Sequence, residues 1–182
     1  MKITALLVIL LLSSYVHAQE ENSEQSEKGS HRVSLGLSHV NIAQGVKDSG
    51  SKWLSVPAWS VDYDYWLSDQ WAIGLHTDII VESFEVKANL SSEEETLERS
   101  SPIAPAAVGI YKATKQSSFL FGVGAEFAKE ENLFLNRIGY EWGTEISPKW
   151  ELGLSACYDF RWNAYDSFLI GISVCRKFKA KK

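Results

Sequence analysis

The clearest pattern in the chain is an alternation of apolar and polar residues on both sides of a short turn. Between residues 59 and 67 the apolar residues occupy every second position, and after a turn at residues 68–70 the alternation continues to residue 82. Successive side chains of a β-strand point to opposite faces, so this pattern predicts an antiparallel hairpin with one apolar face.

The pattern that opens the second arm of this hairpin recurs along the chain. Four five-residue segments share apolar first, third and fifth positions and a glycine at the fourth, and they are Val33–Leu37, Trp71–Leu75, Phe119–Val123 and Trp150–Leu154. Their starting residues are separated by 38, 48 and 31 positions. A solenoid repeat has a constant period, whereas a meander tolerates loops of different length. The repeats therefore indicate four up-strands of a meander, each followed by a down-strand.

The alternation predicts eight strands, joined in turn by short and longer connections. We place them at residues 31–45, 54–67, 71–87, 103–113, 118–128, 133–146, 150–162 and 167–178. Tight turns are expected at 68–70, 114–117 and 147–149, with longer, charged loops near 46–53 and 88–102. The fold class is therefore all-β, an eight-stranded antiparallel up-and-down barrel.

Alternation alone does not say which face is outside, so a soluble lipocalin-like, lipid-binding barrel is an alternative to a transmembrane β-barrel. The apolar face carries the bulky aromatics Trp59, Tyr63, Tyr65, Trp71, Phe119, Phe121, Phe127, Tyr140, Trp142, Trp150, Tyr158, Phe160 and Phe168. The other face carries Gly36, Gly74, Gly122, Gly124, Gly139, Gly143, Gly153 and Gly171. An eight-stranded barrel is too narrow to hold the aromatics, and glycine suits a crowded lumen. The apolar face is therefore predicted to point into lipid, with aromatics beside the tight turns as an interfacial girdle.

In this respect the chain resembles the small eight-stranded outer-membrane barrels of the OmpA membrane-domain type. The resemblance covers residues 32–178, and the final strand, Phe168–Phe178, is similar to the C-terminal strand by which such proteins are recognised for insertion. It departs from that family in the four residues after the final aromatic. The resemblance implies a monomer in the bacterial outer membrane, with outer-membrane lipids and the barrel-insertion machinery as its partners.

The rest of the chain fits an exported protein. Residues 1–18 have the features of a secretory signal peptide, 19–30 of a disordered acidic leader, 31–178 form the barrel, and 179–182 a basic tail. Removing the signal peptide leaves 17 basic residues against 23 acidic ones, a net charge of −6. This acidity argues against nucleic acid as a partner.

The polar parity of the strands carries the ionisable chemistry. The expected lumen network comprises Asp62, Asp64, His76, Asp78, Glu82, Glu126, Arg137, Glu141, Asp159 and Arg161, with Glu145 and Glu151 on the same parity. A turn centred on Pro148 would set Arg137 opposite Asp159, and one centred on Asp69 would set Asp62 opposite His76. Buried charges must be paired, so the favoured interpretation is a polar network that closes the lumen. Nine inward acids against two inward arginines leave open a minor cation conductance.

Cys157 and Cys175 are the two cysteines, and both lie on the lumen parity of neighbouring strands. The periplasm is oxidising, so an exported chain with two cysteines invites a disulfide. A turn centred on Asp166 would set them opposite each other, and a turn one residue earlier would place them on a diagonal. Two free thiols that fill the lumen are the alternative.

An outer-membrane lipid-modifying enzyme is a further alternative, because Ser38 and His39 lie on the first strand. Adjacent strand residues point to opposite faces, so these two cannot form a catalytic dyad by themselves. The spacing of the remaining histidines gives no metal site, and no cofactor motif is present. The sequence therefore favours a non-enzymatic barrel with a structural, surface-interaction or minor-conductance role.

Overall fold

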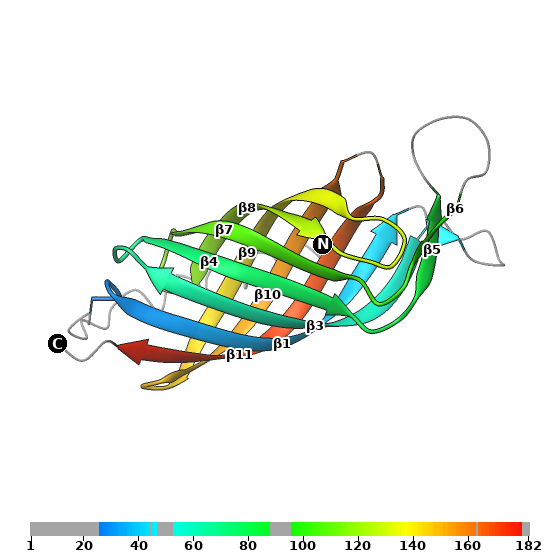
Figure 1. Cartoon of the computed structure of the whole chain (residues 1–182). Helices are drawn as coiled ribbons and strands as arrows, with labels where there is room; N and C mark the ends of the chain where they lie inside the picture. The colour runs from blue at the N-terminus through cyan, green and yellow to red at the C-terminus, as the bar shows by residue number, and fades with distance from the viewer. Residues whose placement is uncertain (1–25, 44, 47–52, 88–95, 163, 180–182) are drawn as a thin grey trace, which may run out of the picture.

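The computed structural model, which describes residues 26–43, 45–46, 53–87, 96–162 and 164–179, is a closed β-barrel (Figure 1). Its eight antiparallel strands run in the order β1, β3, β4, β7, β8, β9, β10 and β11, and β11 pairs back with β1. Their bounds are β1 Ser30–Ala43, β3 Trp53–Trp66, β4 Trp71–Ile80, β7 Ile103–Lys112, β8 Ser117–Glu126, β9 Leu133–Ser147, β10 Trp150–Arg161 and β11 Asp166–Lys179. The predicted up-and-down barrel is therefore confirmed.

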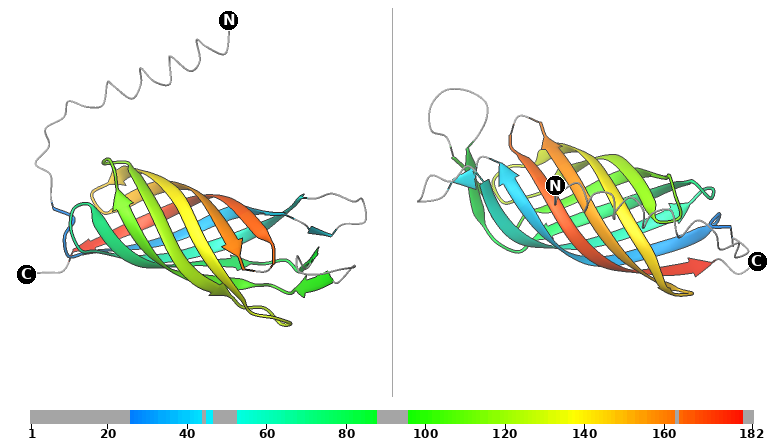
Figure 2. Two further views of the ribbon diagram at one scale, coloured as in Figure 1. Left: turned by 90° about the horizontal axis from the view of Figure 1, so that it is seen from above. Right: turned by 180° about the vertical axis from the view of Figure 1, so that it is seen from behind.

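The two ends of the barrel differ, as the views in Figure 2 make clear. The turn end carries the three short connections, β3–β4, β7–β8 and β9–β10, together with the start of β1 and the end of β11. Two of these turns share one device, in which Ser68 and Thr114 each accept backbone N–H bonds from the residues two and three positions later. The loop end carries the four longer connections.

Side chains alternate between a filled lumen and an apolar exterior. The outward residues Leu35, Ile73 and Phe121 are 55, 53 and 52% exposed, whereas most lumen-facing residues are buried. Glycines relieve the crowding inside, since a Cβ added at Gly122 would lie 2.7 Å from a Val108 methyl carbon. The outward apolar face contradicts the lipocalin-like alternative, which requires that face to line the interior. No helix among the described residues is long and apolar enough to span a membrane.

A second, small sheet extends the loop end, and the sequence did not predict it. Its strands β2 (Gly45–Val46), β5 (Phe84–Lys87) and β6 (Thr96–Arg99) pair in the order β2-β5-β6. The predicted strand 71–87 is therefore wrong in its second half: β4 ends at Ile80, and β5 leaves the barrel wall. The reason lies in residues 81–83, which are all exposed and so break the alternation between the buried Ile80 and Phe84.

The barrel also begins earlier than predicted. Residues 26–30 fell within the predicted disordered leader, but Ser30 already pairs with Lys179. Before it, Asp69 of the β3–β4 turn accepts bonds from the Ser26 hydroxyl and the Glu27 amide, each at 2.7 Å. These contacts tie residues 26–29, which we call the N-terminal strap, to the turn end. The predicted signal peptide and residues 19–25 lie outside the described residues.

Candidate functional site

The candidate site is the lumen itself, where charged side chains meet from almost every strand. At its loop end, Glu126 of β8 lies between two arginines. Arg99 Nε and Arg161 Nε donate to the two carboxylate oxygens at 2.8 and 2.5 Å, and the Tyr165 hydroxyl lies 2.7 Å from one of them. Burial raises the pKa of Tyr165, which therefore stays a neutral hydrogen-bond donor. All four side chains are almost completely buried.

A third arginine continues this network toward the barrel centre. Arg137 Nε donates to Asp159 at 2.7 Å, and its terminal nitrogen also contacts Asp78 of β4. Arg161 lies 3.7 Å from Asp159 and so links the two groups. We call this series the loop-end chain, and its members, from the outside inward, are Arg99, Glu126, Arg161, Asp159, Arg137 and Asp78. Three arginines face three carboxylates, so the loop-end chain is electrically balanced.

A second group, the central cluster, lies closer to the turn end. Arg32 of β1 donates to Asp64 at 2.8 Å and to Glu141 at 2.6 Å. His76 lies 2.8 Å from Asp64, and 3.9 and 3.8 Å from Asp62 and Glu141. The register sets Asp62 opposite His76 and Arg137 opposite Asp159. These are the two pairings that the turn centres predicted.

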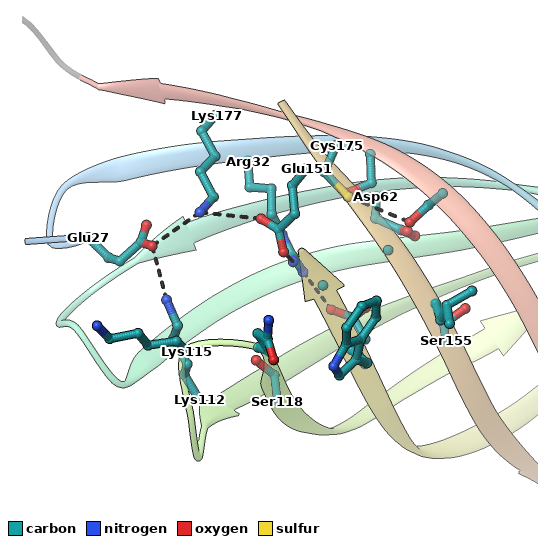
Figure 3. A pocket seen from close by; sticks show the side chains of 18 of the residues that line it. Glu27, Arg32, Asp62, Lys112, Lys115, Ser118, Glu151, Ser155, Cys175 and Lys177 are labelled. Carbon is teal, nitrogen blue, oxygen red and sulfur yellow. Dashed lines mark hydrogen bonds and ion pairs between the residues drawn. The ribbon is translucent and has the colours of Figure 1, made fainter. Parts of the chain in front are cut away.

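At the turn end, the strap contributes Glu27 to the charged residues of the lumen. Glu27 accepts hydrogen bonds from Lys112 at 3.0 Å and Lys177 at 3.3 Å, and Lys177 also lies 3.3 Å from Glu151 (Figure 3). Burial alone would raise the pKa of Glu27, but the two ammonium groups outweigh it and leave that pKa lowered. The cavity between these residues and Arg32 has a volume of about 30 Å³. It has room for only one or a few water molecules.

The structure changes the predicted charge balance of the lumen. Glu82 is exposed beyond the end of β4, so it is not part of the network. Four further cations do point inward, namely Arg32, Arg99, Lys112 and Lys177. Three of these lie on the lumen parity of their strands and could have been found by extending the alternation. The excess of nine acids over two arginines is therefore wrong, and with it the main argument for a cation pore.

Apolar side chains fill much of the remaining lumen, which the sequence reading did not emphasise. Buried residues of this kind near the loop end are Val40, Ile42, Val56, Ile80, Leu133, Leu135 and Leu169. The small sheet adds to them, because the Phe84 and Tyr165 rings meet edge to face at 5.8 Å between centroids. The loop end is thus packed by a hydrophobic layer around the buried loop-end chain.

The register excludes the possible disulfide, which the sequence left open beside two free thiols. Cys157 lies opposite Leu169, and Cys175 lies opposite Glu151. Six residues along β11 separate Leu169 from Cys175, about 20 Å at roughly 3.3 Å per residue. A disulfide needs Cα atoms within about 7 Å. Both thiols are free and buried.

The residues considered for lipid chemistry are not brought together. Ser38 faces the lumen, 3.4 Å from the carbonyl oxygen of Ala58, whereas His39 is exposed on the outer face. Within the described part of the chain, no three histidine, cysteine or carboxylate groups are arranged to hold a metal ion.

No protein-family model matches the chain, and neither does any curated protein sequence. Solved structures do match. The attachment invasion locus protein Ail of Yersinia pestis aligns over 83% of this chain and 99% of its own, with 12% identity and a TM-score of 0.54. The outer membrane protein OprG of Pseudomonas aeruginosa aligns over 84% and 97%, with 12% identity and a TM-score of 0.55.

The chain has the fold of the small outer-membrane barrels. At this level of identity the likeness extends to the fold alone, and it agrees with the strand number, the antiparallel closure and the apolar exterior described above. The chemistry of this barrel therefore depends on the residues of its own lumen and its own loop end.

Proposed function

We propose that this protein is a monomeric outer-membrane barrel with a closed lumen, whose role is to present its loop end as an interaction surface. The short turns and both termini would face the periplasm, and the loop end would face the exterior. This orientation follows the general plan of outer-membrane barrels, which have short periplasmic turns and longer extracellular loops. Insertion by the barrel machinery is part of the proposal, supported by the strand Phe168–Phe178.

One observation carries the proposal: the loop-end chain crosses the lumen and also holds the small sheet. Arg99 belongs to β6, outside the barrel wall, yet its side chain is fully buried against Glu126. The same carboxylate binds Arg161, which continues the chain into the barrel. A conducting barrel would keep this path open and hydrated. Here the charges that could line a pore are used to close it and to fix an external sheet.

The charge of the loop end limits which partners fit it. Its exposed ionisable residues, among those described, are Glu82, Glu85, Lys129, Glu130, Glu131 and Glu98. Ail, one of the similar structures, has been solved with the heparin analogue sucrose octasulfate. An acidic surface repels such polyanions, so we expect no retention of the present protein on heparin at physiological salt. Retention there would contradict this part of the proposal.

Orientation is tested by cysteine labelling on intact cells. A membrane-impermeant maleimide should label Lys129→Cys, at the exposed β8–β9 connection, without permeabilisation. Gln70→Cys, in an equally exposed turn at the other end, is the matched control and should react only after the outer membrane is opened. The two native thiols are buried and should stay silent. The reverse labelling pattern would overturn the topology.

A second candidate function, a minor conductance, is favoured only by the small cavity at the turn end. That cavity is lined by Glu27, Lys177 and Arg32 at the turn end, and its lining reaches Asp62 and Ser60 on β3. A lipid-modifying enzyme is not supported, because the candidate serine and histidine lie on opposite faces of β1.

A further inference from the structure

A single arginine interrupts the apolar exterior of the barrel. Among the described residues of the eight barrel strands, Arg176 is the only arginine or lysine on the outward parity, where its neighbours in β11 are Val174 and Phe178. The other strand arginines point into the lumen. A charge on the lipid-facing side of a barrel is destabilising unless it lies near an interface. The position of Arg176 relative to the membrane interface, and the contacts of its side chain, therefore need an explanation.

The side chain of Arg176 lies between two aromatic rings. Its guanidinium carbon is 5.3 Å from the ring centroid of Trp150 on β10 and 5.1 Å from that of Phe178 on its own strand. Both distances fall within the range of cation–π contacts. Within the described part of the chain Arg176 makes no ion pair, while every strand arginine in the lumen does. Arg176 is exposed, its guanidinium is held by the two rings, and no carboxylate of a described residue neutralises it.

The surrounding residues place this group at an interface. Arg176 pairs with Trp150, the first residue of β10, so it lies at the rim of the turn end. Phe178 faces His31 across the β1–β11 seam, and His31 Nδ1 lies 2.7 Å from the Tyr63 hydroxyl. Aromatic rings with polar atoms at one level are typical of the boundary between hydrocarbon and headgroups.

We propose that Arg176, held between Trp150 and Phe178, is a binding site for the phosphate group of a phospholipid in the leaflet at the turn end. At this depth a phospholipid phosphate is the abundant anion, and guanidinium binds phosphate through two parallel hydrogen bonds. The two rings fix the arginine, so little conformational freedom is lost on binding. This site lies outside the lumen and does not depend on whether the lumen conducts.

The test uses the full-length mature protein in detergent micelles, titrated with phosphatidylglycerol and followed by native mass spectrometry. Arg176→Gln should weaken lipid binding about tenfold, the expected loss of one charge-assisted contact. Lys149→Gln is the matched control: it removes one exposed cation from the neighbouring β9–β10 turn and should have little effect. Equal weakening by both variants, or no weakening by Arg176→Gln, would overturn the site.

Two further arms separate the site from a general effect of charge or folding. Arg176→Lys keeps the charge but loses the planar fork, so its affinity should lie between those of the wild type and Arg176→Gln. Trp150→Leu should also weaken binding while leaving the charge in place. Both comparisons use only protein that shows heat-modifiable migration. Millimolar inorganic phosphate should not displace the lipid; displacement would mean a free-anion site and would contradict the proposal.

Discussion

Arg99 and Glu126 join two structures that would otherwise be separate, the external sheet and the barrel wall. Arg99 Nε and a terminal nitrogen lie 2.8 and 2.5 Å from one Glu126 oxygen, and neither side chain is exposed to solvent. Arg99 also donates to the Glu131 carbonyl oxygen at 2.5 Å. A loop anchored in this way behaves as part of the barrel.

The first prediction concerns this anchor. Among the described residues, Glu126 is the one carboxylate that pairs with Arg99 and lies within 3 Å of Arg161. Glu126→Gln should therefore lower the free energy of unfolding by about 3–5 kcal/mol. Arg99→Gln leaves Glu126 paired with Arg161 and should cost roughly 1–3 kcal/mol. The exposed neighbour substitution Glu98→Gln is the control, expected within about 0.5 kcal/mol of wild type. Equilibrium urea unfolding in detergent, followed by tryptophan fluorescence, measures these changes in unfolding free energy. A larger loss in Arg99→Gln than in Glu126→Gln would refute the anchor.

The second prediction concerns the lipid face. Leu75 and Leu154 are about half exposed on the outer wall, near the middle of β4 and β10. Leu75→Arg and Leu154→Arg should each destabilise the inserted barrel by about 2–4 kcal/mol. Leu75→Ala and Leu154→Ala are the controls without a charge. Arginine variants that fold as stable, lipid-free soluble proteins would contradict the transmembrane assignment.

The third prediction concerns acid. The pKa of Glu27 is lowered in the folded protein. The ion pairs of Glu27 with Lys112 and Lys177 therefore stabilise the strap at pH values above 4.5, which is the ordinary pKa of this group. This stabilisation is lost as the pH falls below 4.5 toward the lowered pKa. Hydrogen exchange of residues 28–30 should therefore be faster in Glu27→Gln than in wild type at pH 7, and the ratio should shrink below pH 4.5. A ratio that does not change with pH would exclude the ionised form of Glu27 as the cause.

The fourth prediction concerns the cysteines. Denatured, non-reduced protein from fresh membranes should show two titratable thiols, because the register separates Cys157 from Cys175 by six residues along β11. Fewer than two thiols in the monomer would mean a bridge and would require a different β10–β11 register.

The sequence predicts those parts of the fold that local features, namely strand alternation and tight turns, determine. The outward face and most barrel strand ends follow from alternation alone, to within about two residues. Two lumen pairs, Arg137 with Asp159 and Asp62 with His76, follow because tight turns fix the register of a hairpin. The β10–β11 register is different, since its connection folds inward and buries Ala164 and Tyr165. No turn residue in this connection indicates that packing in the sequence.

The external sheet was invisible for a similar reason. β6 has four residues, too few for an alternating pattern to be recognised beside an acidic run. It is attached to the barrel by a long-range contact from Arg99 to Glu126. The glycines show the same limit. At Gly74, which lies on the lumen parity, an added Cβ would collide with Asp64 of the central cluster and lie 2.8 Å from the Tyr63 carbonyl oxygen. Which lumen position tolerates a methyl group is decided by packing between strands.

The most direct test of a closed lumen is ion current across planar bilayers. Wild-type protein, shown to be inserted by its heat-modifiable migration, should give no stepwise conductance in 1 M KCl, about the ionic strength at which surface charge is screened. Arg137→Ala combined with Asp159→Ala removes one pair of the loop-end chain and leaves Asp78 without its arginine partner, and it serves to show whether a gap there admits ions. Silence from wild type beside a conducting porin control is the predicted result. Reproducible stepwise current from the wild-type barrel would contradict the account.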